Sequence, residues 1–228
     1  MVTLSVYDIS NWISDMTILQ RQHMLSLVCV ERQKKIAQIK IPERKDYVLV
    51  AGYLLEQQLR EYIMEQYAED VWEIHFSYGK QGKPYLAEYP EVYFNMSHSG
   101  SYVAIAIGTV CLGVDVEVNS RNALAVAKRC FHEREYQELL CYKEEPKLLE
   151  RHFKQYWSMK EAYIKYKGEG LQIPLSSFLV LPKEKRIAGQ DKLAFYCDKL
   201  NDGCVSLCYE VEGDPKVHYN IQVCAKLL

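Results

Sequence analysis

Two acidic residues alternate with valines in one short segment, Gly113-Val114-Asp115-Val116-Glu117-Val118. In a β-strand alternate side chains share a face, so Asp115 and Glu117 are expected on one side and the valines in the core. Neighbouring carboxylates repel each other, and a cation between them relieves that repulsion. Oxygen ligands of this kind suit Mg²⁺, which shares its coordination shell with the phosphates of a substrate. The segment therefore has two interpretations, a Mg²⁺ site or an exposed strand edge with two solvated acids.

A second group of candidates lies in the segment Trp157-Ser158-Met159-Lys160-Glu161-Ala162-Tyr163-Ile164-Lys165. On a helix Trp157, Glu161 and Lys165 follow an i, i+4, i+8 spacing and form one stripe. Glu161 could supply a third carboxylate to the same oxygen site. The alternative is an ordinary surface ion pair between Glu161 and Lys165. The tryptophan on the same stripe weakens that alternative, because a surface pair does not need a large aromatic anchor.

The segment Phe94-Asn95-Met96-Ser97-His98-Ser99-Gly100 is typical of a strand that ends in a polar turn. Ser97, His98 and backbone N–H groups near Gly100 could bind a phosphate oxygen. A nucleophile–base pair of Ser97 with His98 is excluded, because adjacent side chains on an extended chain point apart. The sequence has no G-x-S-x-G, G-x-x-x-x-G-K-[ST] or G-x-G-x-x-G motif, so these kinds of hydrolase and nucleotide site receive no support.

Basic residues form two short runs, Arg32, Lys34 and Lys35 in one, and Lys80 and Lys83 in a turn rich in glycine. A short run of charge is usually a solvated face. The chain of 228 residues carries 28 lysines and arginines against 30 acidic residues, a formal charge of −2. A protein that binds nucleic acid over its whole surface would carry more positive charge. Any phosphate site on this chain is therefore expected to be local.

The eight cysteines include no C-x-x-C pair. This spacing gives a zinc site little support and favours free thiols in a reducing cytoplasm. No stretch approaches about 20 consecutive apolar residues, so no transmembrane helix is expected. Residues 1–10 lack the basic start, long apolar run and cleavage site of a signal peptide. We therefore expect a cytoplasmic protein.

Three long stretches have helical patterns. Pro42 can open a helix because its missing N–H would be unpaired there anyway, and apolar residues at helical spacing follow it, so a helix is expected over 42–67. Similar patterns predict helices at 123–142 and 148–167. Gly168-Glu169-Gly170 is expected to end the last of them.

Strands are expected between and after these helices. The apolar runs 102–107 and 111–118 predict a hairpin with a tight connection at Gly108-Thr109. Short alternating runs indicate further strands from Phe178 onward. Helices and mainly antiparallel strands are thus mixed without a regular βαβ rhythm, and the predicted fold class is α+β.

In combination and in this order, these segments resemble the 4′-phosphopantetheinyl transferases of the surfactin-synthetase-activating (Sfp) type. The pairing of G-[IV]-D-[IV]-E with W-x-x-K-E-x-x-x-K, about 40 residues apart, is far more specific than either half. The similarity is continuous from about Glu31 to Phe178. The matching segments are Gly82-Lys83-Pro84, Phe94-Asn95-x-Ser97-His98-Ser99-Gly100, Gly113-Val114-Asp115-Val116-Glu117, Trp157-Ser158-x-Lys160-Glu161-Ala162-x-x-Lys165, and Gly168 through Gly170-Leu171 to Pro174-Leu175.

The resemblance implies two similar α+β halves related by a pseudo-twofold axis, over 1–109 and 110–228, with coenzyme A in the cleft between them. It implies Mg²⁺-dependent transfer of the 4′-phosphopantetheine group of coenzyme A to a serine of an apo acyl carrier or peptidyl carrier protein, as in polyketide and nonribosomal peptide synthesis. Adenosine 3′,5′-bisphosphate would be the other product. The duplicated architecture predicts a monomer, with no nucleic acid or membrane partner.

The resemblance also implies roles for individual residues. Three carboxylates would hold Mg²⁺ against the pyrophosphate, and Glu161 would also accept the serine proton. Lys165 would stabilise charge that develops on the phosphoryl oxygens or on the leaving phosphate. The metal residues are then Asp115, Glu117 and Glu161, the catalytic residues are Glu161 and Lys165, and the residues that bind coenzyme A are Arg32, Lys35, Lys45, Lys83, Ser97 and His98.

The chain departs from the family just before Gly52. Family members often carry Arg followed by Ser or Thr there, both facing the 3′-phosphate of coenzyme A, whereas this chain has Val48 and Leu49. Lys45, about one helical turn earlier, is the candidate that would replace the missing charge. Otherwise the contact with the 3′-phosphate is weaker, and so is the preference for coenzyme A over its dephospho form.

Two other classes of function use the same residues. A Mg²⁺-dependent hydrolase of phosphate or pyrophosphate bonds would use the three carboxylates with water in place of serine. A carrier-binding module without activity would have lost part of the site. The complete set of Asp115, Glu117, Glu161 and Lys165 argues against that module.

Overall fold

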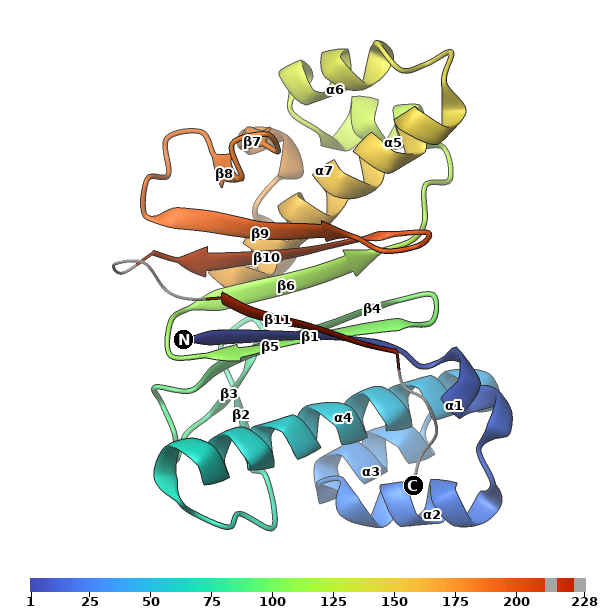
Figure 1. Cartoon of the computed structure of the whole chain (residues 1–228), viewed down its shortest axis with the longest axis vertical. Coiled ribbons are helices and arrows are strands. Elements are labelled where there is room, and N and C mark those ends of the chain that lie inside the picture. The colour runs from blue at the N-terminus through green and yellow to red at the C-terminus, as the bar shows by residue number, and fades with distance from the viewer. Residues whose placement is uncertain (212–216, 224–228) are drawn as a thin grey trace.

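The computed structural model describes residues 1–211 and 217–223 of the chain. Two β-sheets lie against each other, one long helix covers the outer face of each sheet, and shorter helices surround the long ones (Figure 1). The helices are α1 Ser10–Asp15, α2 Ile18–Leu27, α3 Val30–Ala37, α4 Pro42–Tyr67, α5 Ala123–Cys130, α6 Glu133–Leu140 and α7 Pro146–Lys167, with short 3₁₀ turns at Gly170–Gln172 and Leu175–Ser177.

The larger sheet has four strands in the order β11-β1-β5-β4, and the smaller has three in the order β6-β10-β9. Strand β11 runs parallel to β1, and the other pairs are antiparallel. Two short hairpins, β2–β3 and β7–β8, lie outside the main sheets. The strands are β1 Val2–Asp8, β2 Phe76–Tyr78, β3 Pro84–Leu86, β4 Tyr93–Ser99, β5 Tyr102–Gly108, β6 Leu112–Glu117, β7 Val180–Leu181, β8 Arg186–Ile187, β9 Leu193–Lys199, β10 Cys204–Glu210 and β11 Val217–Val223.

Three apolar clusters fill the spaces between these layers. One lies between α4 and the four-stranded sheet, a second between the two sheets, and a third between the three-stranded sheet and α7. Alternation along the strands produces this arrangement, because successive side chains point to opposite faces. On β6, for example, Val114 and Val116 enter the cluster between the sheets. Asp115 therefore lies on the face toward α7.

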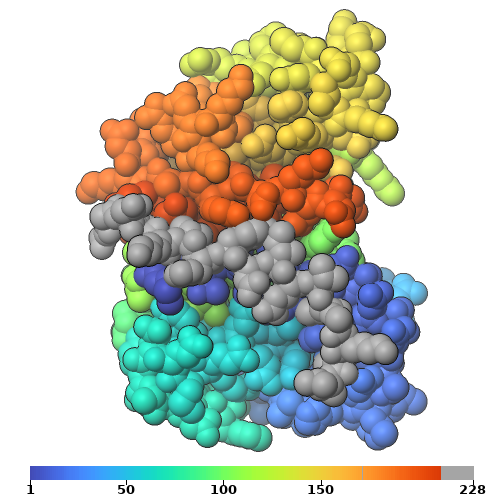
Figure 2. All heavy atoms as spheres, in the orientation of Figure 1, coloured from blue at the N-terminus to red at the C-terminus, as the bar shows by residue number. Residues whose placement is uncertain are grey.

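The architecture confirms the predicted α+β class with two similar halves. Figure 2 shows the halves as two lobes, with the blue-to-green residues of the N-terminal half below the orange and yellow residues of the C-terminal half. The sheets divide between β5 and β6, close to the predicted boundary at 109/110, but β11 of the C-terminal half pairs with β1 of the N-terminal half. The exact boundary stays a prediction.

Helix α4 has the bounds predicted from the sequence. Pro42 stands in its first turn, and Ala68 ends it in the left-handed conformation with its N–H bonded to the Met64 carbonyl. Gly52 lies where the Arg32 side chain crosses the helix, since an added Cβ would come within 2.2 Å of Arg32 Cδ. Helix α7 also ends as predicted, at Gly168 with φ +69°. No helix in the described ranges is long and apolar enough to cross a membrane.

Two elements differ from their predictions. The segment 123–142 forms two helices rather than one, because the chain is extended at Phe131 and His132 and the His132 side chain caps α6 by accepting from the Arg134 N–H. The predicted hairpin of β5 with β6 is wrong, because the two strands belong to different sheets. The hairpin forms instead between β4 and β5, where Gly100 adopts φ +56° in the turn.

The contact of α7 with β6 depends on a missing side chain. Gly113 lies directly under the helix backbone, and a Cβ at this position would come within 2.1 Å of the Tyr166 nitrogen and 2.3 Å of the Ala162 oxygen. Neither atom can move aside without shifting the helix. Gly113 therefore sets how closely α7 approaches the strand that carries Asp115.

We predict that Gly113→Ala lowers the free energy of unfolding by about 1–3 kcal/mol, because the added methyl group overpacks a contact with the helix backbone. Gly79→Ala is the matched control, since its added Cβ meets only the Lys83 carbonyl oxygen, at 3.6 Å. Urea unfolding of both variants measures the difference. Equal stability of the two variants would contradict the close helix–strand contact.

Candidate functional site

The two sheets meet at their edges through polar side chains. Strands β4 and β6 are edge strands of different sheets, and alternate residues of β4 point toward β6. Their bonds join Asn95 Oδ1 to the Val114 N–H (3.0 Å), Ser97 Oγ to Asp115 Oδ1 (2.8 Å), and Ser99 Oγ to Glu117 Oε1 (2.7 Å). Residues from the two predicted phosphate and metal segments are thus in direct contact.

Helix α7 adds a lysine to this junction. The Lys165 ammonium donates to Asp115 Oδ1 and to Ser97 Oγ, each at 2.7 Å. Ser97 in turn donates to the same oxygen of Asp115. Three predicted site residues from β4, β6 and α7 are therefore mutually hydrogen-bonded: the Ser97 hydroxyl, the Asp115 carboxylate and the Lys165 ammonium.

Only one oxygen of the Asp115 carboxylate takes part in these hydrogen bonds. The residue is 6% exposed, and its Oδ2 is buried without a hydrogen-bond partner among the described residues. Burial raises the pKa of Asp115, and the ion pair with Lys165 opposes that rise. Buried polar atoms without a partner are rare in folded proteins. This oxygen therefore fits a further electropositive ligand.

Glu161 lies one turn before Lys165 on α7 and accepts no hydrogen bond from another described residue. Burial raises the pKa of Glu161, and the negative charges of Asp115 and Glu117 raise it further. Glu117 is held by Ser99 and by the backbone N–H of Asn119 at 2.7 Å. The three predicted metal residues thus repel one another, as expected for carboxylates that share a cation site.

These carboxylates are not gathered as a ready set of ligands. Within residues 1–211 and 217–223, no three His, Cys, Asp or Glu side chains are arranged so that they could hold a metal ion. The reason is electrostatic, because Asp115 is drawn to Lys165 and Glu117 to hydrogen-bond donors of its own. The partnerless oxygen of Asp115 and the unbonded Glu161 are the observations that fit Mg²⁺ at this place.

His98 points away from Ser97, as expected for neighbours on a strand, and its electrostatic neighbours include Arg44 on α4. Partial loss of hydration lowers the pKa of the His98 ring, and the positive charges of Lys165 and Arg44 lower it further. Arg44 is exposed in the first turn of α4 and forms no ion pair with a described residue. Sequence reasoning missed Arg44, although its position one turn before Val48 is a signal for it.

Two other predicted basic contacts, Arg32 and Lys35, are engaged within the chain. Arg32 donates from Nε to the buried Glu56 (2.7 Å) and lies over the Phe76 ring. Lys35 pairs with Glu31 at 2.8 Å and with the Tyr78 hydroxyl at 3.0 Å. Lys45 is half-buried.

Lys83 lies at the boundary between the two halves. Its ammonium donates to the backbone carbonyls of Leu112 (3.0 Å) and Tyr166 (3.1 Å), both in the C-terminal half. Burial lowers the pKa of Lys83. The predicted contact of Lys83 with coenzyme A thus concerns a side chain that already has two internal acceptors.

Lys160 has a structural place in its motif. Its side chain is fully buried, and the ammonium contacts the Glu135 carboxylate at 2.8 Å and the carbonyls of Leu175 (2.7 Å) and Phe178 (2.9 Å). Glu135 also accepts from the Val180 N–H at 2.7 Å. These contacts of Lys160 connect α6, α7 and the segment before β7. The next residue, Glu161, is close enough to Asp115 and Glu117 for their charges to raise its pKa.

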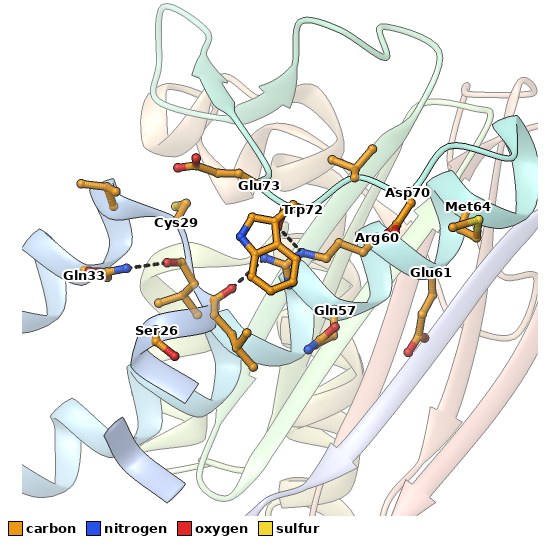
Figure 3. A pocket seen from close by; sticks show the side chains of 14 residues that line it. Ser26, Cys29, Gln33, Gln57, Arg60, Glu61, Met64, Asp70, Trp72 and Glu73 are labelled. Atoms are coloured by element: carbon orange, nitrogen blue, oxygen red, sulfur yellow. Dashed lines mark hydrogen bonds between the residues drawn. The ribbon is translucent and has the colours of Figure 1, made fainter. Parts of the chain in front are cut away.

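A pocket of about 430 Å³ lies in the N-terminal half and is lined by the end of α2, the start of α3, the later turns of α4 and residues 70–73 (Figure 3). Arg60 bonds to the carbonyls of Trp72 and Leu27 there. Its lining on α4 starts 13 residues after Arg44, which is about 20 Å along the helix. None of the predicted site residues lines this pocket.

Both halves of the chain match known protein families. Residues 111–221 match the 4′-phosphopantetheinyl transferase superfamily, and residues 12–109 match the N-terminal part of 4′-phosphopantetheinyl transferases. The chain is 32% identical over 206 residues to 4′-phosphopantetheinyl transferase Sfp of Bacillus subtilis. The aligned region covers 90% of this chain and 85% of the relative. The chain is 41% identical over 123 residues to 4′-phosphopantetheinyl transferase psf-1 of Bacillus pumilus, 54% of this chain and 52% of that relative.

The buried ion pair of Lys160 with Glu135 predicts that Lys160 stabilises the fold. Lys160→Met is expected to cost about 3–5 kcal/mol in the free energy of unfolding, because it leaves the Glu135 charge buried without its partner. Lys147→Met, an exposed change in the first turn of the same helix, is expected to stay within about 0.5 kcal/mol. Urea unfolding measures both, and similar unfolding midpoints would argue against a structural role for Lys160.

Proposed function

The chain belongs to the 4′-phosphopantetheinyl transferase superfamily, and from this premise we propose that it transfers the 4′-phosphopantetheine group of coenzyme A to a serine of an apo acyl carrier or peptidyl carrier protein, with Mg²⁺ as the required metal. Adenosine 3′,5′-bisphosphate is the proposed second product. The observation that carries the proposal is the meeting of Asp115, Ser97 and Lys165 at the junction of the halves, with one carboxylate oxygen left without a partner.

Asp115, Glu117 and Glu161 are the residues that would hold Mg²⁺, since oxygen ligands suit this ion. A Mg²⁺ ion bound there would neutralise negative charge on the pyrophosphate of coenzyme A. The support from this chain is the buried Asp115 Oδ2 and the raised pKa of Glu161 beside two other carboxylates. Coenzyme A would lie between the halves, where the β4–β6 junction brings phosphate-binding and acidic residues together.

The reaction joins the serine oxygen of the carrier to the β-phosphorus of coenzyme A. The bond between that phosphorus and the bridging oxygen breaks, and the oxygen leaves with adenosine 3′,5′-bisphosphate. Glu161 is the proposed acceptor of the serine proton, because Asp115 and Glu117 already accept hydrogen bonds from Ser97, Lys165 and Ser99. Lys165 is proposed to stabilise the charge on the phosphoryl oxygens or on the leaving phosphate.

The phosphates of coenzyme A are proposed to contact the basic and polar side of the junction. Ser97 and His98 stand at the end of β4, and Arg44 adds a charge from the first turn of α4. Arg32 and Lys35 remain proposed contacts of the 3′-phosphate, and in this role they would use hydrogen-bonding capacity beyond their bonds to Glu56 and Glu31.

We predict that Asp115→Asn and Glu161→Gln each abolish transfer while the protein stays folded, because both changes keep the side-chain shape and remove a ligand charge. Glu150→Gln, a change of an exposed residue on α7, the helix that carries Glu161, should keep full activity. The assay is the intact mass of an apo carrier protein incubated with coenzyme A and Mg²⁺, where transfer adds about 340 Da, the mass of the transferred group.

The same assay separates the transferase from a hydrolase. Removing Mg²⁺ with a chelator is expected to stop the mass gain, and adding Mg²⁺ back to restore it. Release of nucleotide from coenzyme A without any carrier modification would favour hydrolysis. Full transfer by Asp115→Asn or Glu161→Gln would refute the metal assignment.

A second prediction concerns the departure at Val48 and Leu49. Lys45→Ala is expected to raise the KM for coenzyme A several-fold if Lys45 supplies the missing charge, and Arg44→Ala tests the neighbouring candidate in the same way. Each variant is compared on coenzyme A and dephospho-coenzyme A, because loss of a 3′-phosphate contact affects only the first. A KM that changes in neither variant would remove the idea of compensation from this turn of α4.

A further inference from the structure

Lys83 connects the N-terminal half to the two elements that carry the site. It follows the glycine-rich turn between β2 and β3, and its ammonium reaches the carbonyls of Leu112 and Tyr166. Leu112 is the first residue of β6, three residues before Asp115. Tyr166 lies in the last turn of α7, directly after Lys165. One side chain thus bonds to the strand of the carboxylate and to the helix of the lysine that pairs with it.

The bond to Tyr166 satisfies a group that the helix cannot satisfy itself. Carbonyls in the last turn of a helix have no intrahelical N–H partner, and they form the negative end of the helix dipole. A cation is favourable at this end. The Lys83 ammonium is therefore a C-terminal cap for α7 supplied from the other half of the chain.

The end of α7 is shaped to admit this side chain. Gly168 ends the helix with φ +69°, and an added Cβ there would lie 2.9 Å from Lys83 Cδ. A larger residue would therefore crowd the lysine stem as well as strain the backbone. Lys83 thus packs against Gly168 while its ammonium bonds to the carbonyls of Leu112 and Tyr166.

Burial strengthens the need for these acceptors. A charged group that loses water is stable only when its hydrogen bonds are replaced. Lys83 is half-buried, and two carbonyl oxygens replace its water. Two of the three N–H donors of this ammonium are directed at the two carbonyls, which leaves at most one for a phosphate. Moving the ammonium onto a phosphate would leave the Tyr166 carbonyl with only the weak bond from the Cys111 thiol at 3.7 Å.

We infer that Lys83 is a positioning residue, which holds the last turn of α7 against the start of β6 so that Lys165 meets Asp115, rather than a contact of coenzyme A. This inference rests on the proposed function of the site. It replaces the role that the family resemblance implies for the Lys83 side chain. Its consequence is that Lys83 acts on the rate of the reaction through Lys165 and not on the affinity for coenzyme A.

The test is the steady-state kinetics of Lys83→Met, which keeps the length of the stem and removes the ammonium. We expect kcat to fall about tenfold to a hundredfold, as for misplaced catalytic groups, with the KM for coenzyme A within about twofold of the unchanged enzyme. Lys80→Met is the matched control from the same turn, where Lys80 is exposed, and it should change neither constant. A raised KM with an unchanged kcat would overturn the inference, as would no change in either.

Hydrogen exchange gives a second readout that does not depend on catalysis. The Gly168 amide, which donates to the Ile164 carbonyl at 3.0 Å, is expected to exchange faster in Lys83→Met and not in Lys80→Met. Unchanged exchange would overturn the positioning role. If the unaltered chain itself transfers nothing from coenzyme A, the proposed function fails and the exchange experiment alone decides the role of Lys83. Lys83→Gln, which keeps a donor, serves for both measurements if Lys83→Met does not fold.

Discussion

A carboxylate buried under α7, where the edges of the two sheets meet, is the constraint on which the site depends. Asp115 is nearly inaccessible, yet it keeps an ion pair with Lys165 and a bond from Ser97 on only one of its oxygens. A buried charge is stable only when it is paired and hydrogen-bonded, so the strand, the edge of the other sheet and the last turn of α7 must all stay in place. Gly113 lets α7 approach β6 closely, and Lys83 bonds to the Tyr166 carbonyl in the last turn of α7.

Neighbouring residues within one motif have different tasks, because secondary structure turns adjacent side chains in different directions. On β4, Ser97 faces the acidic strand while His98 lies near Arg44 of α4. On α7, Lys160 is sealed in a buried pair with Glu135, whereas Glu161 stands beside the other carboxylates. This motif therefore combines a residue of a buried structural pair with a residue proposed for the chemistry, and a loss of activity on mutation does not by itself distinguish them.

Local patterns predicted much of this arrangement, and contacts between distant segments escaped them. Pro42 and the apolar spacing predict α4 with its observed bounds, and alternation puts Asp115 and Glu117 on one face. Strand pairing depends on which distant strands compete for an edge, so the hairpin of β5 with β6 was predicted wrongly. The caps at His132 and the reach of Lys83 across the halves likewise depend on side-chain positions that no spacing rule contains.

The central claim is that Asp115 holds a divalent cation that assists the binding of coenzyme A at the junction of the halves. Calorimetric titration of coenzyme A into the protein, with Mg²⁺ and with a chelator, tests it most directly, and no carrier protein is needed. The account predicts tighter binding with Mg²⁺ in the unaltered chain and the same affinity under both conditions in Asp115→Asn. Equal affinities under both conditions in the unaltered chain would contradict the claim.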